Sequence, residues 1–187
     1  MEVKKIKILF FIGTLNSGGK ERRLLELMTY LNKFDRYSLV LVTKQSQVMF
    51  DNFFDLNVEW ISLKSKKYNL LSFLEFYRIA RKIEPDFIHS WGNKQTLISL
   101  PFKFFNKKTK LINSQITSAP PRLSLGEKII PKVNFLFSDR ILSNSFAGID
   151  AFKPTVKKSS VIYNSLNLNR FINLSNTNFV MEKYGIF

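Results

Sequence analysis

A pair of adjacent glycines lies in the loop that follows the first apolar run of the chain. The loop has the sequence Gly13-Thr-Leu-Asn-Ser-Gly-Gly-Lys-Glu-Arg22. Because they lack a Cβ atom, Gly18 and Gly19 let the backbone come close to a phosphate group, and a helix that starts here presents N–H groups to an anion. The sequence therefore predicts a phosphate-binding loop at Gly18 and Gly19.

Two well-known nucleotide-binding patterns fail in this loop. The dinucleotide pattern requires a glycine where Leu15 stands, and the P-loop pattern requires a lysine where Gly19 stands. NAD binding and ATPase chemistry are therefore disfavoured. A plain structural turn stays open as the alternative, although it explains one glycine better than two.

The single histidine, His89, ends a short apolar segment and is followed by Trp91 and Asn93. An imidazole can donate a hydrogen bond to a sugar hydroxyl or to a phosphate. Indole and amide groups offer the stacking face and the hydrogen bonds that carbohydrate sites use. These residues predict a binding role, with a structural role for His89 and Trp91 as the alternative.

The elements that must position these residues alternate between strands and helices. The near-continuous apolar run Ile6–Ile12 is typical of a strand buried on both faces, and Leu24, Leu27 and Met28 have helical spacing. Strands are expected at 6–12, 37–43, 58–63, 86–89, 110–114, 139–143 and 160–163, and further helices at 70–83, 94–105, 125–137 and 145–152. This alternation predicts an α/β fold, a Rossmann-like parallel sheet with helices on both faces. The glycine loop and His89 would then meet at the carboxyl edge of the sheet.

Composition excludes several kinds of chemistry. The chain has 187 residues, of which 45% are hydrophobic, so it can bury a core. It has no cysteine and one histidine, which excludes disulfides, thiolate metal sites and multi-histidine metal centres. No apolar run approaches the roughly 20 residues of a membrane-spanning helix, and no signal peptide is recognisable. We therefore expect a cytoplasmic protein.

The formal charge of +15 favours partners that carry phosphate groups. Aromatic and basic residues alternate over 64–82 and 102–108, a mixture that suits an anionic membrane surface or single-stranded nucleic acid. The simpler alternative is that the apolar faces pack on the sheet while the lysines are solvated.

The C-terminal part of the sequence differs in composition. Residues 164–178 are polar and rich in Asn and Ser, and residues 179–187 have the pattern of a helix that stops with the chain. We expect a Rossmann-like lobe over residues 1–165, a linker over residues 166–178, and the start of a truncated second lobe over residues 179–187.

Four segments resemble motifs of family-4 glycosyltransferases. Gly18-Gly-Lys-Glu-Arg22 resembles the G-G-x-E-R loop before the first helix of those enzymes, and Asp86-Phe-Ile-His-Ser-Trp-Gly92 resembles their D-x-x-H-S-W-G segment. Asp139-Arg-Ile-Leu-Ser-Asn-Ser145 is similar to A-D-x-x-x-S-N-S, and Val161-Ile-Tyr-Asn-Ser-Leu-Asn-Leu-Asn-Arg-Phe171 to V-I-Y-N-G-x-D-x-x-R-F. The four occur in the family's order across nearly the whole chain.

The resemblance implies the GT-B fold, in which two Rossmann-like lobes enclose a cleft, with this chain as the N-terminal, acceptor-side lobe. It implies an enzyme, a hexosyltransferase-like glycosyltransferase, that moves a sugar from a nucleotide diphosphate sugar to a saccharide or lipid-linked saccharide acceptor. Transfer would proceed with retention, without a metal or cofactor, in cell-surface polysaccharide synthesis. The protein would contact the inner face of the membrane peripherally and would bind no nucleic acid. This lobe alone would be inactive, because the family's donor-binding groups belong to the second lobe.

The same resemblance assigns roles within this lobe. Gly18 and Gly19 would bind the donor diphosphate. The acceptor side and the cleft would be lined by Arg22, His89, Trp91, Asn93, Asn144 and Ser145, and no residue of this lobe would be catalytic.

The sequence departs from the family's pattern in two places. Ser165 and Asn167 replace the usual glycine and acidic residue of the last motif, and Gln115 and Ile116 stand where many members have a histidine. Either this chain works differently there or His89 takes over part of that histidine's role. Two alternatives to a glycosyltransferase remain, namely a non-catalytic basic Rossmann-like module that binds nucleic acid or another polyanion, and a non-catalytic scaffold.

Overall fold

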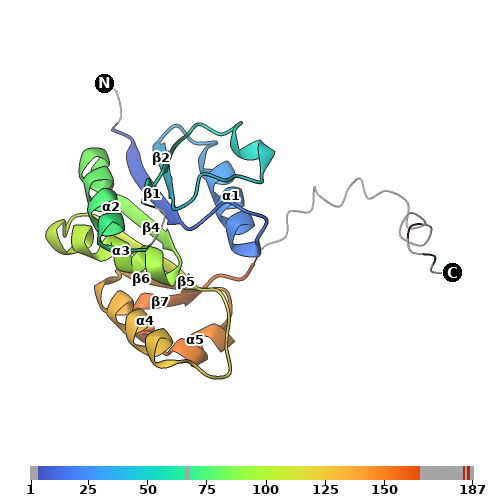
Figure 1. The fold of residues 1–187 in the computed structure, drawn as a ribbon, viewed down its shortest axis with the longest axis vertical. Coiled ribbons are helices and arrows are strands. Elements are labelled where there is room, and N and C mark those ends of the chain that lie inside the picture. The colour runs from blue at the N-terminus through green and yellow to red at the C-terminus, as the bar shows by residue number, and fades with distance from the viewer. Residues whose placement is uncertain (1–3, 66–67, 165–182, 184, 186–187) are drawn as a thin grey trace.

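The computed structural model describes residues 4–65 and 68–164, together with Lys183 and Gly185. In this part of the chain seven strands form one sheet (Figure 1). The strands are β1 (Ile6–Ile12), β2 (Tyr37–Thr43), β3 (Val58–Ser62), β4 (Phe87–Trp91), β5 (Lys110–Ile116), β6 (Arg140–Ser143) and β7 (Ser159–Val161). Every neighbouring pair is parallel. The predicted parallel sheet is therefore confirmed.

The strand order is β3-β2-β1-β4-β5-β6-β7, so the direction of winding reverses at β1. The chain first adds β2 and β3 on one side of β1 and then crosses over to add β4 to β7 on the other. At such a reversal the connections after β1 and β4 diverge, and a crevice opens at the carboxyl ends of the two strands. The glycine loop follows β1 and Gly92 follows β4, so both border this crevice.

The described residues also form five α-helices and two 3₁₀ turns. They are α1 (Gly19–Leu31), α2 (Leu70–Ile83), α3 (Asn93–Phe105), α4 (Leu125–Phe137), α5 (Phe146–Phe152), η1 (Asp51–Phe53) and η2 (Val156–Lys158). Figure 1 shows α1 on one side of the sheet and α2, α3 and α4 on the other. Right-handed crossovers require this arrangement, because connections that run in opposite directions along a sheet lie on opposite faces.

Alternate side chains of β1 enter two separate hydrophobic clusters. Phe10 and Ile12 pack with the residues of α1, whereas Leu9 and Phe11 pack with those of α2 and α3. Phe11 stacks on Phe76 of α2, with ring centroids 4.5 Å apart. All four β1 side chains are fully buried, as the apolar run predicted.

The α1 side of the sheet is covered unequally. Over β1 and β2, α1 packs closely through Leu24 and Met28. On the same side, His89 of β4, Ser114 of β5 and Leu142 of β6 face a cavity. The outer edge of α1 and these three strands therefore form the walls of a groove.

The helix ends follow their sequence signals. Asn69 caps α2, because its side chain accepts a hydrogen bond from the Ser72 N–H at 3.3 Å in a capping box. Ser124 and Glu127 form the same box at the start of α4. At the other end of α2, Glu84 adopts a left-handed conformation with φ of 50°. The predicted bounds of α2 and α4 are confirmed.

The predicted strand at 86–89 is placed wrongly, because β4 extends to Trp91 and His89 lies in its middle. His89 and Ser90 had the polarity of strand-ending residues, but both are buried and hydrogen-bonded. The Ser90 hydroxyl lies 2.8 Å from the Thr96 hydroxyl and donates to the Ile112 carbonyl. Strand β5 likewise runs beyond its predicted end at 114, with a register irregularity, to Ile116.

Some predictions fall on other parts of the chain. The predicted linker at 166–178 lies outside the described residues, as does the predicted second-lobe segment at 179–187 apart from Lys183 and Gly185. Among the described residues, no helix combines the length and the apolar character that crossing a membrane requires.

Candidate functional site

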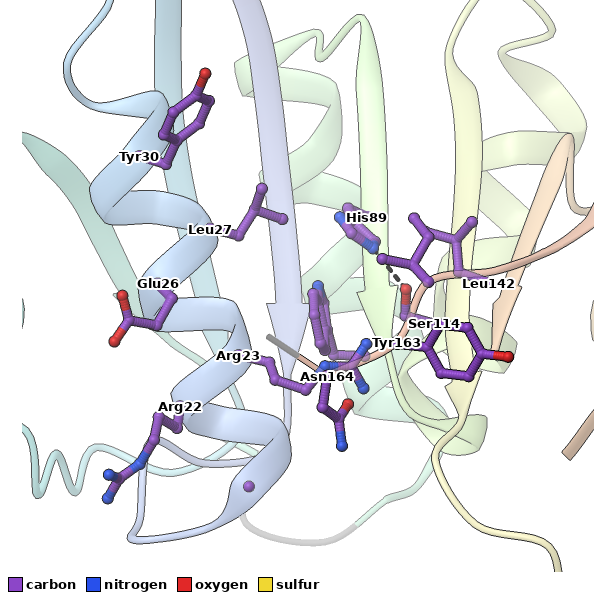
Figure 2. A pocket seen from close by; sticks show the side chains of 13 residues that line it. Arg22, Arg23, Glu26, Leu27, Tyr30, His89, Ser114, Leu142, Tyr163 and Asn164 are labelled. Atoms are coloured by element: carbon purple, nitrogen blue, oxygen red, sulfur yellow. Dashed lines mark hydrogen bonds between the residues drawn. The ribbon is translucent and has the colours of Figure 1, made fainter. Parts of the chain in front are cut away.

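A cavity of about 570 Å³ lies between α1 and the strands β4, β5 and β6 (Figure 2). It begins at Gly19, where α1 starts at the carboxyl edge of the sheet, and extends along the helix as far as Tyr30. The lining residues are Gly19, Arg22, Arg23, Glu26, Leu27, Tyr30, His89, Trp91, Ser114, Leu142, Ile162, Tyr163 and Asn164. The cavity thus occupies the crevice that the strand order predicts for a ligand.

His89 and Ser114 meet in the strand wall of the cavity. The His89 Nε2 atom lies 2.7 Å from the Ser114 hydroxyl oxygen. Burial, and secondarily the positive charge of Arg23, lower the pKa of His89 from 6.5 to about 3. The imidazole is therefore neutral near pH 7, with one ring nitrogen as a donor and the other as an acceptor.

Arg23 and Trp91 meet between the helix wall and the strand wall. The Arg23 guanidinium lies over the Trp91 ring at 5.5 Å from its centroid, and the ring centroids of Trp91 and His89 are 4.9 Å apart. Trp91 is 3% exposed, and its indole N–H has no hydrogen-bond partner among the described residues. The Trp91 ring thus lines the cavity and supports the Arg23 guanidinium.

The helix wall of the cavity is polar at one end and apolar at the other. Gly19 and Arg23 lie toward the start of α1, and Leu27 and Tyr30 lie toward its end, while the His89–Ser114 pair and Leu142 belong to the strand wall across from the helix. Figure 2 shows Arg23 and Leu27 pointing toward the strands, while Arg22 and Glu26 point away from them. The Arg22 guanidinium lies over Phe50, 5.7 Å from the ring centroid. Arg22 therefore borders the cavity without directing its charged group into it.

The glycine loop is arranged differently from the prediction. Gly18 is the N-cap of α1, and its N–H donates to the Asn16 carbonyl at 2.8 Å, so it is already bound within the loop. The Glu21 carboxylate folds back against the Cα of Gly18. Gly19 lines the cavity, and a Cβ there would meet nothing within 4 Å. Of the glycine pair, the structure thus brings only Gly19 to the site.

Three predicted site residues have local structural partners and do not line the cavity. The Asn93 side-chain oxygen accepts a hydrogen bond from Asn134 of α4 at 2.7 Å. Asn144 donates to the Thr117 carbonyl at 3.0 Å, and Ser145 caps α5 by accepting the Gly148 N–H at 3.1 Å. Asn144 and Ser145, which belong to the Ser-Asn-Ser sequence, thus form hydrogen bonds that stabilise the local fold.

Sequence reasoning missed most of the helix wall. Arg23, Glu26 and Tyr30 are spaced three and four residues apart, next to the apolar stripe that the helical pattern identified. That spacing predicts a second stripe beside the buried one. Tyr163 and Asn164 belong to the motif that starts at Val161, and the resemblance assigns no role to their side chains.

No group of three or more His, Asp or Glu side chains that could hold a metal ion occurs among residues 4–65 and 68–164. A scan against models of protein families and a search of curated proteins both find no match.

Solved structures share the fold of the chain. The Anabaena protein Alr3699/HepE in complex with UDP-glucose matches with a TM-score of 0.73 at 18% identity, over 96% of this chain and 50% of that one. The lipopolysaccharide outer core galactosyltransferase WaaB, in its apo form, matches with a TM-score of 0.63 at 14% identity, over 87% and 47%. The UDP-GlcNAc 2-epimerase from Methanocaldococcus jannaschii matches with a TM-score of 0.58 at 14% identity, over 85% and 46%.

This chain spans about half the length of those structures. Its seven-stranded parallel sheet, with helices on both faces, is the Rossmann-like half of a GT-B-like fold. At these identities the likeness concerns the fold alone.

Proposed function

We propose that this chain is the acceptor-side lobe of a retaining glycosyltransferase that uses a nucleotide diphosphate sugar. The observation that carries the proposal is the cavity at the strand reversal, where Gly19, Arg23 and the neutral His89 converge. Two of the structures that share the fold are a complex with UDP-glucose and a galactosyltransferase, which supports a nucleotide sugar as the donor and transfer as the reaction.

In this proposal the start of α1 faces the donor diphosphate when a second lobe closes over the cavity. The N-terminal end of a helix carries a partial positive charge, which stabilises a nearby anion. The second lobe provides the further groups that stabilise the departing diphosphate, so this chain alone transfers no sugar. The reaction requires neither a metal nor a cofactor.

The remaining cavity residues bind the acceptor, a saccharide or a lipid-linked saccharide of cell-surface polysaccharide synthesis. His89 contributes a neutral ring that Ser114 holds in place. Apolar side chains flank it on both sides, Leu27 and Tyr30 from α1 and Leu142 from β6, and exposed Tyr163 offers a ring at the mouth. Polar groups beside apolar side chains suit a sugar that is attached to a hydrophobic carrier.

A substitution at Gly19 tests the donor site. An aspartate at this position has open space and suits the first turn of a helix, so Gly19→Asp should fold normally. Its charge would lie near the donor diphosphate, and such repulsion in a partly buried site costs enough to raise KM for UDP-glucose about 10- to 100-fold. The measurement is UDP release with saccharide acceptors by the protein joined to its second lobe.

The matched control is Gly19→Asn, which has the same shape without the charge and should keep KM within about two-fold. Equal KM values for the two variants would contradict the donor site. Sugar transfer by the isolated chain, at the rate of the two-lobed protein, would contradict the division of roles between the lobes. Product analysis by NMR tests retention directly.

We further propose that the lobe contacts the inner face of a membrane through the outer side of α4. Leu125, Ile129 and Leu136 are 77%, 60% and 69% exposed, and their spacing places them on one side of the helix. The exposed Lys128 and Lys132 lie beside them. Exposed apolar side chains flanked by lysines suit an anionic bilayer, because the aliphatic side chains enter the interface while the lysines meet lipid phosphates.

A further inference from the structure

Arg23 extends from α1 into the cavity without an acidic partner. Figure 2 shows its side chain directed toward β4 and β5. Among the described residues it forms no ion pair and no side-chain hydrogen bond, and its contact is the Trp91 ring at 5.5 Å. Its side chain is partly buried, and burial lowers the pKa of Arg23.

An arginine in this position is costly to the fold. A guanidinium stays charged at every physiological pH and carries five N–H donors. Removing such a charge from water without a partner destabilises a protein, and the cation–π contact with Trp91 offsets only part of that cost. The arrangement is therefore favourable when a ligand supplies the missing negative charge.

The groups around Arg23 are neutral or act as donors. His89 is uncharged near pH 7, Ser114 is bound to His89, and the buried Trp91 N–H has no acceptor among the described residues. Glu26, the acidic residue in the lining, points away from the strands in Figure 2. Among the described residues, no acidic side chain points into the cavity beside Arg23, so its interior carries a net positive charge.

We propose that Arg23 binds a negatively charged group, a phosphate or a carboxylate, on the saccharide acceptor. The inference rests on the proposed function and adds the class of acceptor, a saccharide that carries an anion near the sugar that is extended. Arg23 supplies two parallel N–H donors to that anion. Trp91 acts as a positioning residue that holds the guanidinium in place.

The test compares charged and neutral sugars. Glucose 1-phosphate, glucuronic acid, glucose and inorganic phosphate are titrated into the 187-residue chain by calorimetry. We expect the sugar with the correct anion to bind at least about ten-fold more tightly than glucose, because hydrogen bonds between two charged groups are stronger than those between neutral ones. The phosphate and carboxylate sugars distinguish the two anions, and inorganic phosphate shows whether the sugar itself contributes.

Variants at Arg23 and at a remote arginine separate Arg23 from charge in general. Arg23→Gln should remove the preference for the charged sugar, Arg23→Lys should restore part of it, and the control Arg78→Gln, at an exposed position of α2 outside the cavity, should leave it unchanged. Arg23→Gln should also unfold at the same or a higher temperature, because it removes a charge without a partner. Equal affinity of the wild-type chain for charged and neutral sugars would overturn the inference.

The donor is the other possible source of the anion. If Arg23→Gln weakens UDP binding but not binding of the charged sugar, Arg23 serves the donor and the inference is wrong. If the charged sugar binds through Arg23 while the two-lobed protein transfers no sugar, the proposed function fails and the anion site remains. If the wild-type protein extends charged acceptors no better than neutral ones, and Arg23→Gln extends charged acceptors equally well, the inference fails and the function remains.

Discussion

His89 is a histidine that the fold keeps uncharged. It lies between Phe10, with ring centroids 5.7 Å apart, and Trp91, and it meets Ser114 across the neighbouring strand. Burial and Arg23 both disfavour the imidazolium. Because the His89 imidazole on β4 is neutral, the Arg23 guanidinium on the adjacent turn of α1 is the principal positive charge that faces this part of the cavity.

This environment predicts how the stability of the protein depends on pH. The folded-state pKa of about 3 lies below the unfolded value of 6.5, so protons bind preferentially to the unfolded chain. The stability that His89 contributes is complete above about pH 6.5 and is lost as the pH falls toward about 3. Between about pH 7 and about pH 5.5 the free energy of unfolding should decrease by about 1 kcal/mol.

Urea unfolding at the two pH values measures this decrease. The control His89→Gln cannot titrate, so its stability should change little over the same interval. Glu75 and Asp139 contribute little there, because their pKa values are lowered in the folded protein and the unfolded values of about 4 also lie below this pH interval. The same decrease in both proteins would show that His89 does not cause it.

The residue types in the sequence were enough to predict some residues of the site but not the others. Gly19 and His89 were predicted because a glycine pair and a lone histidine are conspicuous in any sequence. Arg22 and Arg23 are adjacent, and only the rotation of α1 relative to the sheet decides which of them enters the cavity. That rotation depends on how Leu24 and Met28 pack beneath the helix, which sequence spacing gives only approximately.

At the level of elements, the loops after β1 and β4 determine the shape of the site. Gly92 joins β4 to α3 with φ of 152°, a conformation that L-residues rarely adopt. The same turn places Gln95, whose side chain donates to the Tyr68 hydroxyl at 2.7 Å and lies 3.2 Å from where a Cβ on Gly13 would be. The two loops are therefore coupled beneath the crevice.

Two glycine substitutions should change stability in opposite directions. Gly92→Ala forces a side chain into a strained conformation and should lower the free energy of unfolding by about 1–3 kcal/mol. Gly126 lies in the first turn of α4, has ordinary φ, and a Cβ there would meet nothing within 4 Å. Gly126→Ala should therefore raise the free energy of unfolding by up to about 1 kcal/mol.

Urea unfolding of both variants provides the measurement, and each serves as the control for the other. If Gly92→Ala were as stable as the unchanged protein, the turn would adopt another conformation without cost. A loss of stability in Gly126→Ala would show that α4 begins later than Leu125.

Whether a segment forms a helix or a strand was largely predictable, because the spacing of apolar residues and the capping residues are local features of the sequence. Helix α2 is an example, since Asn69 and the apolar spacing after it define its start and its course. Strand β4 was misplaced because its polar residues find partners on β5 and α3, which are remote in sequence. The inward-facing pair His89 and Ser114 illustrates this, because they are 25 residues apart.

At the scale of the whole molecule, the two faces of the sheet have different surroundings. The α1 face holds the cavity, and the opposite face is covered by α2, α3 and α4 (Figure 1). At the C-terminal end of α4, half-buried Phe137 contacts exposed Phe104 of α3, with ring centroids 6.3 Å apart. The proposed membrane surface therefore lies away from the cavity, as the proposed closure of a second lobe over the cavity requires.

The double variant Leu125→Ser/Ile129→Ser tests this surface. Both side chains are exposed, so the fold should be unaffected, whereas binding to vesicles of phosphatidylcholine and phosphatidylglycerol should fall about ten-fold or more. Co-sedimentation measures the binding. The control Met49→Ser removes an exposed side chain in the loop after β2 and should bind as before.

The same proteins address the polyanion alternative. A labelled single-stranded oligonucleotide is titrated at low and high salt, because binding through phosphates weakens steeply with salt. Tight oligonucleotide binding, together with vesicle binding that the α4 variant leaves unchanged, would favour a general polyanion-binding module over the membrane surface.

The fold class was predictable because strands and helices alternate along the chain, and a right-handed crossover leaves few topologies. The groove was not predictable, because it exists where β4, β5 and β6 have a cavity beside them rather than a helix. The sequence around His89, Ser114 and Leu142 has no local pattern that indicates whether a helix or a cavity lies opposite these side chains.

The stacking of Arg23 on Trp91 also gives the protein an optical reporter. The chain has two tryptophans, and Trp60 lies on β3, where its indole N–H donates to the Thr43 hydroxyl at 2.9 Å. With Trp60→Phe, the emission of the remaining indole comes from the floor of the cavity alone. The intensity of this emission would change when a molecule draws the Arg23 guanidinium away from the Trp91 ring. Binding in the cavity could therefore be followed in real time without an attached dye.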